Sequence, residues 1–272
     1  MEAIQMKEKF EAHLRKSNLS ENTIISYTWT IDYYLSHYDG ITMENLLAYK
    51  GYLMELYKPK TVNLRIQAIN KYLEFLNKSK LQLKFIKVQQ KNFLENVISN
   101  ADYRFLKNSL KKDGNAEWYF VIWYLAATGA RVSELIQIKI EHVYAGYIDL
   151  YTKGGKLRRL YIPIKLKNET IVWLEKANRN SGFLFLNRFG ERITTRGISQ
   201  QLKNYAEKYG VNTKVVYPHS FRHRFAKNFL EKYNDIALLA DLMGHESIET
   251  TRIYLRRTAS EQQTLVDKIV TW

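Results

Sequence analysis

Residues 116–135, AEWYFVIWYLAATGARVSEL, decide how the second half of the chain folds. The run up to Thr128 is apolar on nearly every side, which predicts a helix buried inside a core rather than one lying on a surface. Gly129 breaks that helix, and Arg131 and Glu134 follow at the three-residue spacing of an ion pair on a helical turn. Taken alone, Arg131 is best explained as a surface arginine in a helix–helix corner.

The residues around this core helix predict a mainly α domain with a small antiparallel β-sheet. The segments GYIDLYT (146–152) and LRRLYIPI (157–164) have the composition of strands, and KGGK (153–156) between them is typical of a hairpin turn. Helical spacing is found on both sides of the hairpin, in residues 100–112, 195–209, 219–233, 235–243 and 247–257. We therefore assign residues 98–272 to one domain.

The first 78 residues predict a separate bundle of four helices. Ser20 and Thr42 are expected to cap the second and third helices, and Pro59 separates the third from the fourth. Polar and basic residues on the outer faces suit solvent and DNA phosphates equally well. These candidates for DNA binding are Asn22, Thr23 and Ser26 in the second helix, and Lys60, Asn63, Arg65 and Lys71 in the fourth.

An extended basic linker is predicted between the two domains, over residues 79–97. Residues 77–91, NKSKLQLKFIKVQQK, are rich in lysine and show no helical stripe. Lys84 and Lys87 in this segment are further candidates for DNA contact.

Charge and composition narrow the functional class. The formal net charge of +15 points to a polyanion such as DNA, RNA or an anionic membrane surface. Residues 1–97 carry +4 and residues 98–272 carry +11, so a folded basic surface is favoured over a basic tail. The absence of cysteine excludes disulfides and thiolate–zinc sites. Neither a signal-peptide pattern nor an apolar run of membrane-spanning length is present, so we expect a cytoplasmic protein.

Six side chains suit one reaction when they are considered together, although each has an ordinary structural explanation by itself. A phosphodiester attacked by an oxygen gathers negative charge on its non-bridging oxygens, which two arginine forks match. A tyrosine can supply the attacking oxygen, and a lysine or a histidine can protonate the departing 5′ oxygen. The candidates are Arg131, Lys153, His219, Arg222, His245 and Tyr254. No metal-ligand cluster, glycine-rich nucleotide loop or Ser-His-Asp pattern competes with them.

The segments ATGARVSEL, TKGGK, HSFRHRFA and LMGHESIETTRIYL, in this order, resemble those of the tyrosine recombinase (phage integrase) family, especially its compact Xer-like members. The resemblance covers about residues 100–260 and extends more weakly to the N-terminal bundle, which resembles the core-binding domain of the family. It implies a site-specific DNA recombinase that cuts and rejoins DNA through a 3′-phosphotyrosyl intermediate. It also implies that no metal, ATP or other cofactor takes part.

The resemblance assigns roles by matched position. Arg131 and Arg222 are implied to clamp the scissile phosphate, and Tyr254 is implied to be the nucleophile. Glu134 occupies the acidic position of the family, where it is expected to orient Arg131 or His219.

Three further roles follow from the same motifs. Lys153 is implied to be the general acid, His219 an acid–base group and His245 a hydrogen-bond donor to the phosphate. His223 and Arg224, beside this set, are interpreted as pointing elsewhere.

The family also implies partners and leaves two alternatives open. The expected partner is double-stranded DNA with short inverted-repeat core sites, bound by a dimer on each site and a tetramer in the synapse, with accessory proteins possible. The chain begins near the core-binding bundle, so no separate arm-binding domain is expected. The last fifteen residues, 258–272, predict a short amphipathic helix whose apolar face should dock on a protein surface. Docking on its own domain is one alternative, and the resemblance implies instead that the helix passes to a neighbouring subunit. A topoisomerase IB-like nicking-closing enzyme and a DNA-binding protein without catalysis are the alternatives.

Overall fold

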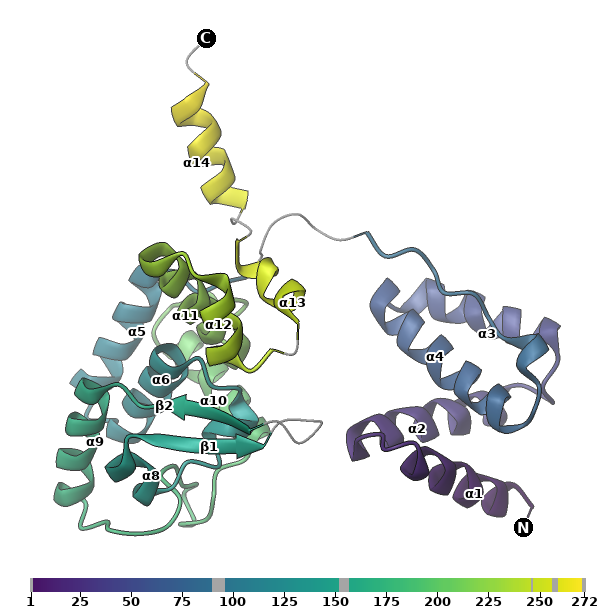
Figure 1. Cartoon of the computed structure of the whole chain (residues 1–272), viewed down its shortest axis with the longest axis horizontal. Helices are drawn as coiled ribbons and strands as arrows, with labels where there is room; N and C mark the ends of the chain where they lie inside the picture. Colours follow the sequence, from purple (N-terminus) through teal and green to yellow (C-terminus); the bar gives the residue numbers. More distant parts are fainter. Residues whose placement is uncertain (1, 90–95, 152–156, 246, 256–258, 271–272) are drawn as a thin grey trace. The chain divides into compact units, whose positions relative to one another are not determined.

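The structure, a computed structural model, describes residues 2–89, 96–151, 157–245, 247–255 and 259–270. It divides into two units, Met1–Gln90 and Lys91–Trp272, which we call the N-terminal and C-terminal units (Figure 1). Each unit has its own hydrophobic core. Among the described residues, no helix is both long and apolar enough to cross a membrane.

Four helices make up the N-terminal unit, as the sequence predicts. They are α1 (Glu2–Lys16), α2 (Glu21–His37), α3 (Met43–Leu56) and α4 (Pro59–Phe75), followed by the short 3-10 helix η1 (Ser79–Leu81). The hydroxyl of Ser20 accepts a hydrogen bond from the backbone N–H of Thr23, and that of Thr42 accepts one from Asn45. Both expected N-caps are therefore confirmed.

The segment after α4 differs from the predicted linker, because the chain up to Ile86 is fixed to the bundle. The side-chain amide of Asn70 donates to the carbonyl oxygen of Leu83 at 2.9 Å, and its oxygen accepts from the N–H of Leu83 at 2.8 Å. Asn63, two turns earlier on α4, binds Ile86 in the same way, with both bonds at 2.9 Å. An asparagine amide offers the same donor and acceptor as a peptide group, so each asparagine pairs with the extended chain as a neighbouring strand does.

The C-terminal unit is mainly helical and is built around α6 (Ala116–Thr128), the helix that the sequence places in the core. Val121, Tyr124 and Leu125 on this helix have no exposed surface. The remaining helices are α5 (Asn100–Lys112), α7 (Val132–Leu135), α8 (Ile140–Ala145), α9 (Ile164–Lys176), α10 (Thr195–Lys208), α11 (Pro218–Tyr233), α12 (Ile236–Met243), α13 (Ile248–Arg252) and α14 (Ala259–Ile269), with a 3-10 turn, η2 (Ile253–Leu255). In Figure 1, α5 and α11 lie beside α6, and both pack against it.

The two predicted strands form the expected antiparallel hairpin, so the mainly α fold with a small sheet is confirmed. β1 (Tyr147–Tyr151) pairs with β2 (Leu157–Tyr161) in a register that places Tyr147 opposite Tyr161. The KGGK turn lies outside the described residues. Arg158 and Leu160 lie on the buried side of β2, between exposed neighbours.

The described part of the C-terminal unit is tied to α11 soon after it begins. The backbone N–H of Ile98 donates to the hydroxyl of Ser220 at 2.7 Å, and the carbonyl oxygen of Ile98 accepts from Nε of Arg224 at 2.8 Å. Ile98 itself is fully buried. Of the predicted linker 79–97, therefore, only residues 87–97 lie between the two anchored ends.

Candidate active site

Arg131 and Glu134 lie at the corner between α6 and α7, which Gly129 makes possible. Gly129 adopts a left-handed φ of 63°, and a Cβ at this position would lie only 2.5 Å from the ring of Phe225. One carboxylate oxygen of Glu134 accepts the backbone N–H of Arg131 at 2.7 Å, and the other accepts its Nη1 at 2.8 Å. The predicted ion pair is confirmed, and it fixes both the backbone and the guanidinium of Arg131.

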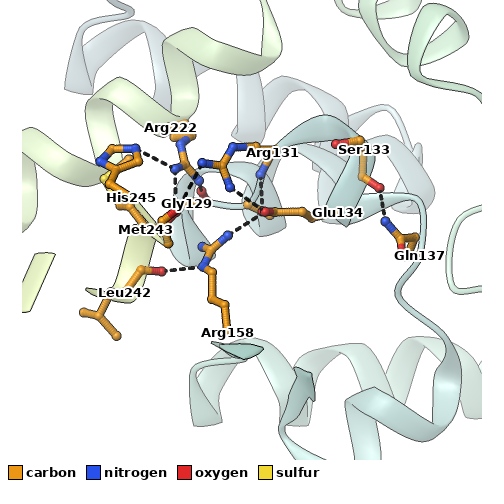
Figure 2. A network of polar contacts seen from close by, with 12 residues as sticks. Gly129, Arg131, Ser133, Glu134, Gln137, Arg158, Arg222, Leu242, Met243 and His245 are labelled. Atoms are coloured by element: carbon orange, nitrogen blue, oxygen red, sulfur yellow. Dashed lines mark hydrogen bonds and ion pairs between the residues drawn. The ribbon is translucent and has the colours of Figure 1, made fainter. Parts of the chain in front are cut away.

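Arg222 is buried beneath this corner, with only 2% of its surface exposed. Its Nη1 donates to the carbonyl oxygen of Gly129 at 2.6 Å, while Nη2 contacts Nε2 of His245 at 3.0 Å (Figure 2). Burial, and then the charge of Arg131, lower the pKa of Arg222 to about 10. The guanidinium therefore remains charged at neutral pH although it is nearly removed from solvent.

Three consecutive carbonyl oxygens at the end of α12 each accept a hydrogen bond from a different arginine. The pairs are Leu242 with Nε of Arg158 at 2.9 Å, Met243 with Nη2 of Arg222 at 2.7 Å, and Gly244 with Nη2 of Arg131 at 3.3 Å. The last carbonyls of a helix lack partners within the helix and carry partial negative charge, so cations are stabilised there. We call residues 242–244 the carbonyl turn. It connects the arginines directly to His245, the next residue.

His245 is held in its neutral form. Its Nε2 must accept from Arg222, because a guanidinium only donates, so Nδ1 carries the proton and donates to the hydroxyl of Thr251 at 2.8 Å. Burial, followed by the charges of Arg222, Arg131 and Arg158, lowers the pKa of His245 to about 4. In this state Nε2 is already occupied by Arg222.

Tyr254 lies in η2, and only 6% of its surface is exposed. It packs with Leu239 and Met243 of α12 in a small cluster that also includes residues of α11. Its ring stacks on that of His245, with centroids 6.0 Å apart and planes at 10°. Burial raises the pKa of the phenol, although the charge of Arg222 opposes this. The described geometry therefore holds the hydroxyl protonated beside Arg222 and His245.

His219 and Lys153 complete the predicted set with different outcomes. His219 lies in the first turn of α11, three residues before Arg222, and is exposed. Partial desolvation, and then the charges of Arg222 and Arg131, lower the pKa of His219. Lys153 falls outside the described residues.

Two residues of this site escaped the sequence analysis. The ring of His223 lies 5.1 Å from that of Tyr254, so the interpretation that His223 points elsewhere is wrong. The signal was its position four residues after His219, which places both on one face of α11. Arg158 was overlooked because Arg159 beside it looks the same in sequence. Only the alternation along β2, with Leu160 also on the core side, distinguishes the two.

The side chains of this cluster carry a surplus of positive charge, which suits an anion. Arg131, Arg158 and Arg222 carry three positive charges against the single carboxylate of Glu134, whose pKa the two nearest arginines hold below its usual value despite the opposing effect of burial. With His245 neutral, the described cluster has a formal surplus of two positive charges.

The predicted DNA-binding residues of the N-terminal unit have mixed surroundings. Arg65 is committed within the bundle: it donates to Thr30 at 2.7 Å and to the carbonyl of Ser26 at 3.1 Å, and it lies over the ring of Trp29. Asn63 uses its amide to hold Ile86. Among the others, Lys71 pairs with Glu74 and Thr23 contacts Ser20, whereas Asn22, Lys60, Lys84 and Lys87 are exposed.

Comparisons with known proteins found similar sequences and similar folds. The model of the phage integrase family matches residues 96–261. Tyrosine recombinase XerA of Pyrococcus furiosus is 31% identical over 270 residues, covering 96% of this chain and 92% of that protein. The crystal structure of XerA recombinase superposes with a TM-score of 0.55 at 22% identity, covering 99% of both chains. The Tn1549 transposon integrase in complex with transposon right end DNA superposes with a TM-score of 0.73 at 15% identity, covering 98% of this chain and 99% of that one.

Proposed function

The chain belongs to the phage integrase family and is a tyrosine recombinase of the Xer type, and from this premise we propose that it cuts and rejoins DNA through a covalent bond between Tyr254 and a 3′ phosphate. The observation that carries this proposal is the convergence of Arg131, Arg222, His245 and Tyr254 around the carbonyl turn. These four side chains come from four separate segments, and the positive charges of the two arginines suit an anion.

The proposed reaction is an exchange of one phosphodiester for another. The phenol oxygen of Tyr254 attacks the phosphorus, the bond from phosphorus to the 5′ oxygen breaks, and that oxygen leaves as a hydroxyl. Arg131 and Arg222 would stabilise the charge that gathers on the non-bridging oxygens. Lys153 or His219 would supply the proton to the leaving oxygen, and the same groups acting in reverse would reseal the strand.

We propose that the contacts around Tyr254 hold the nucleophile inactive until a phosphate binds. The pKa of Tyr254 lies above its ordinary value, and Nε2 of His245 accepts from Arg222 rather than donating. A phosphate between the two arginines would take over this hydrogen bond from Arg222. His245 would then turn its ring and donate to the phosphate, while the phenol proton would pass to the neutral imidazole of His219 or to solvent as the attack proceeds.

We propose DNA partners and an assembly on the same basis. Double-stranded DNA with short inverted-repeat core sites would bind a dimer at each site and a tetramer in the synapse, with the tail from Ala259 passed between subunits. Chromosome dimer resolution and the movement of a genetic element both fit this activity. Either role would place the protein in the cytoplasm, where bacterial and archaeal DNA lies.

The decisive experiment traps the covalent intermediate. The binding site is first identified by sequencing the DNA that remains bound to the protein after denaturation. Cleavage of a suicide duplex, nicked close to that site, frees a short strand that carries the 5′ hydroxyl. This strand diffuses away and cannot be rejoined, so the covalent adduct accumulates and is detected on a denaturing gel. We expect Tyr254→Phe to bind this DNA normally and form no adduct.

Tyr233→Phe is the matched control, because Tyr233 is an exposed tyrosine at the end of α11. This variant should cleave DNA as the unchanged protein does. Adduct formation at the normal rate by Tyr254→Phe would refute the assignment. Relaxation of supercoiled DNA without site preference, and without exchange of strands between sites, would favour the topoisomerase-like alternative instead.

A further inference from the structure

Arg158 is a buried arginine that connects three parts of the site. Only 5% of its surface is exposed. Arg158 lies on β2, whereas Arg131 lies at the corner between α6 and α7 and Arg222 lies on α11. Its Nη1 donates to Glu134 at 2.6 Å, and its Nε donates to the carbonyl oxygen of Leu242 at 2.9 Å (Figure 2). No motif in the sequence analysis and no role in the proposed reaction involves this residue.

At one end, Arg158 determines where the Glu134 carboxylate lies. The same oxygen, Oε1, accepts from Arg158 and from Arg131, while Oε2 accepts the backbone N–H of Arg131. Glu134 is buried, so its position depends on these partners rather than on water. A shift of Arg158 would therefore move the carboxylate and, with it, the guanidinium of Arg131.

At the other end, Arg158 holds the carbonyl turn. Its stem packs so closely on Gly244 that a Cβ there would lie 2.3 Å from its Cδ. The bond to Leu242 restrains the first carbonyl of the turn, and the next two receive Arg222 and Arg131. His245 follows directly, so the place of its ring depends on the same restraint.

Stability alone gives a poor account of this arginine. Its Nη2 is buried and has no hydrogen-bond partner among the described residues. A buried donor without a partner destabilises the fold, and buried ion pairs are often replaced by apolar residues without loss of stability.

We propose that Arg158 is a positioning residue, which fixes the Glu134 carboxylate relative to the carbonyl turn so that Arg131 and His245 reach the same phosphate. It acts through these groups and does not touch the DNA. This inference rests on the proposed function, because it concerns the positions of the side chains that the proposed reaction uses.

The test compares Arg158→Lys with Arg159→Lys on the nicked suicide duplex. Lysine retains the charge but offers one ammonium, which cannot hold both Glu134 and Leu242. Arg159 is the matched control, since it is the next residue, is exposed and pairs only with Asp149 among the described carboxylates. At saturating DNA, we expect the single-turnover cleavage rate of Arg158→Lys to fall by about 100-fold, as displaced catalytic groups typically cause. DNA affinity and the fraction of molecules that eventually react should not change, and Arg159→Lys should behave normally.

Two further measurements separate positioning from general damage. In a Glu134→Gln background, the loss caused by Arg158→Lys should shrink to below about 10-fold, because residues that act through one another are not additive. Arg158→Met, which keeps the length without the donors, should remain folded by its melting profile and cleave as slowly as Arg158→Lys or more slowly.

The proposal is overturned if Arg158→Lys cleaves at the normal rate, or if its losses are fully additive with Glu134→Gln. It is also overturned if the slower reaction reflects only a smaller folded fraction. An unchanged protein that forms no adduct would overturn the proposed function and this inference with it, whereas normal cleavage by both Arg158 variants would overturn the inference alone.

Discussion

Replacing Gly244 by alanine should destabilise the C-terminal unit for two separable reasons. The residue has a left-handed φ of 61°, which disfavours any residue with a Cβ by about 1–2 kcal/mol. The added Cβ would also lie 2.3 Å from Cδ and 3.1 Å from Nε of Arg158, so that side chain must move. Loss of its bond to Leu242, a hydrogen bond from a charged donor, contributes a further loss of about 1.5–3 kcal/mol. The free energy of unfolding should therefore fall by about 2.5–5 kcal/mol.

Gly146→Ala provides the matched control for the backbone effect. Gly146 ends α8 with a left-handed φ of 84°, and the nearest atom to its added Cβ, on Lys167, is 3.9 Å away. This variant should lose only the conformational contribution of about 1–2 kcal/mol. The difference between the two alanine variants then measures the contact with Arg158.

Urea unfolding followed by tryptophan fluorescence measures both values. A Trp29→Phe background removes the tryptophan of the N-terminal unit, so that the signal comes from the C-terminal unit. Equal losses in the two variants, within about 0.5 kcal/mol, would refute the claim that Gly244 is required by Arg158.

Further predictions concern charge, pH, the leaving group and the tail. Arg222→Lys cannot reach both Gly129 and Met243, so single-turnover cleavage should fall at least about 100-fold; a smaller loss would argue against a bidentate clamp. Burial, more than any other cause, lowers the pKa of His223 and of His245 from 6.5 to about 4. Between these two pH values the folded state therefore binds fewer protons than the unfolded chain. The contribution of each histidine should be complete above pH 6.5 and fall by at most about 2 kcal/mol at pH 5, and urea titrations of His223→Phe should lose the share of His223. Lys153→Ala should cleave DNA with a 5′-bridging sulfur far better than ordinary DNA, because a thiolate leaves without a proton; an equal defect on both would exclude it as the acid. Truncation after Ala259 should leave folded, DNA-binding protein with weaker synapsis, as judged by light scattering of the DNA complex; unimpaired recombination would refute tail exchange.

Much of the fold could be predicted because its signals are local. The apolar run of α6, the caps at Ser20 and Thr42, and the strand composition around KGGK each depend on a few neighbouring residues. The attachment of residues 82–86 to α4 could not be predicted, because two asparagine side chains make it by pairing with backbone groups. Such pairing leaves no hydrophobic period in the sequence.

The site could be predicted as a set of residues but not as an arrangement. Arg131, Arg222, His245 and Tyr254 were selected by their order and by the chemistry they share, and the structure brings these four together. The carbonyl turn could not be foreseen, because its acceptors are backbone oxygens that any sequence supplies. Arg158 is functional in our proposal only through such partners, which is why its neighbour Arg159 looked equivalent.

The two asparagine pairs of α4 also limit the length of the tether between the two units, which matters if both units bind one duplex, as we propose. Asn63 anchors the chain at Ile86, and α11 anchors it again at Ile98, so eleven residues, 87–97, separate the fixed points. Whatever their conformation, eleven residues span at most about 40 Å. In the proposed complex with DNA, binding of one unit would confine the other to a small volume around the duplex and raise its local concentration to about the millimolar range. Releasing Ile86 from Asn63 would lengthen the tether and so lower the local concentration of the second unit.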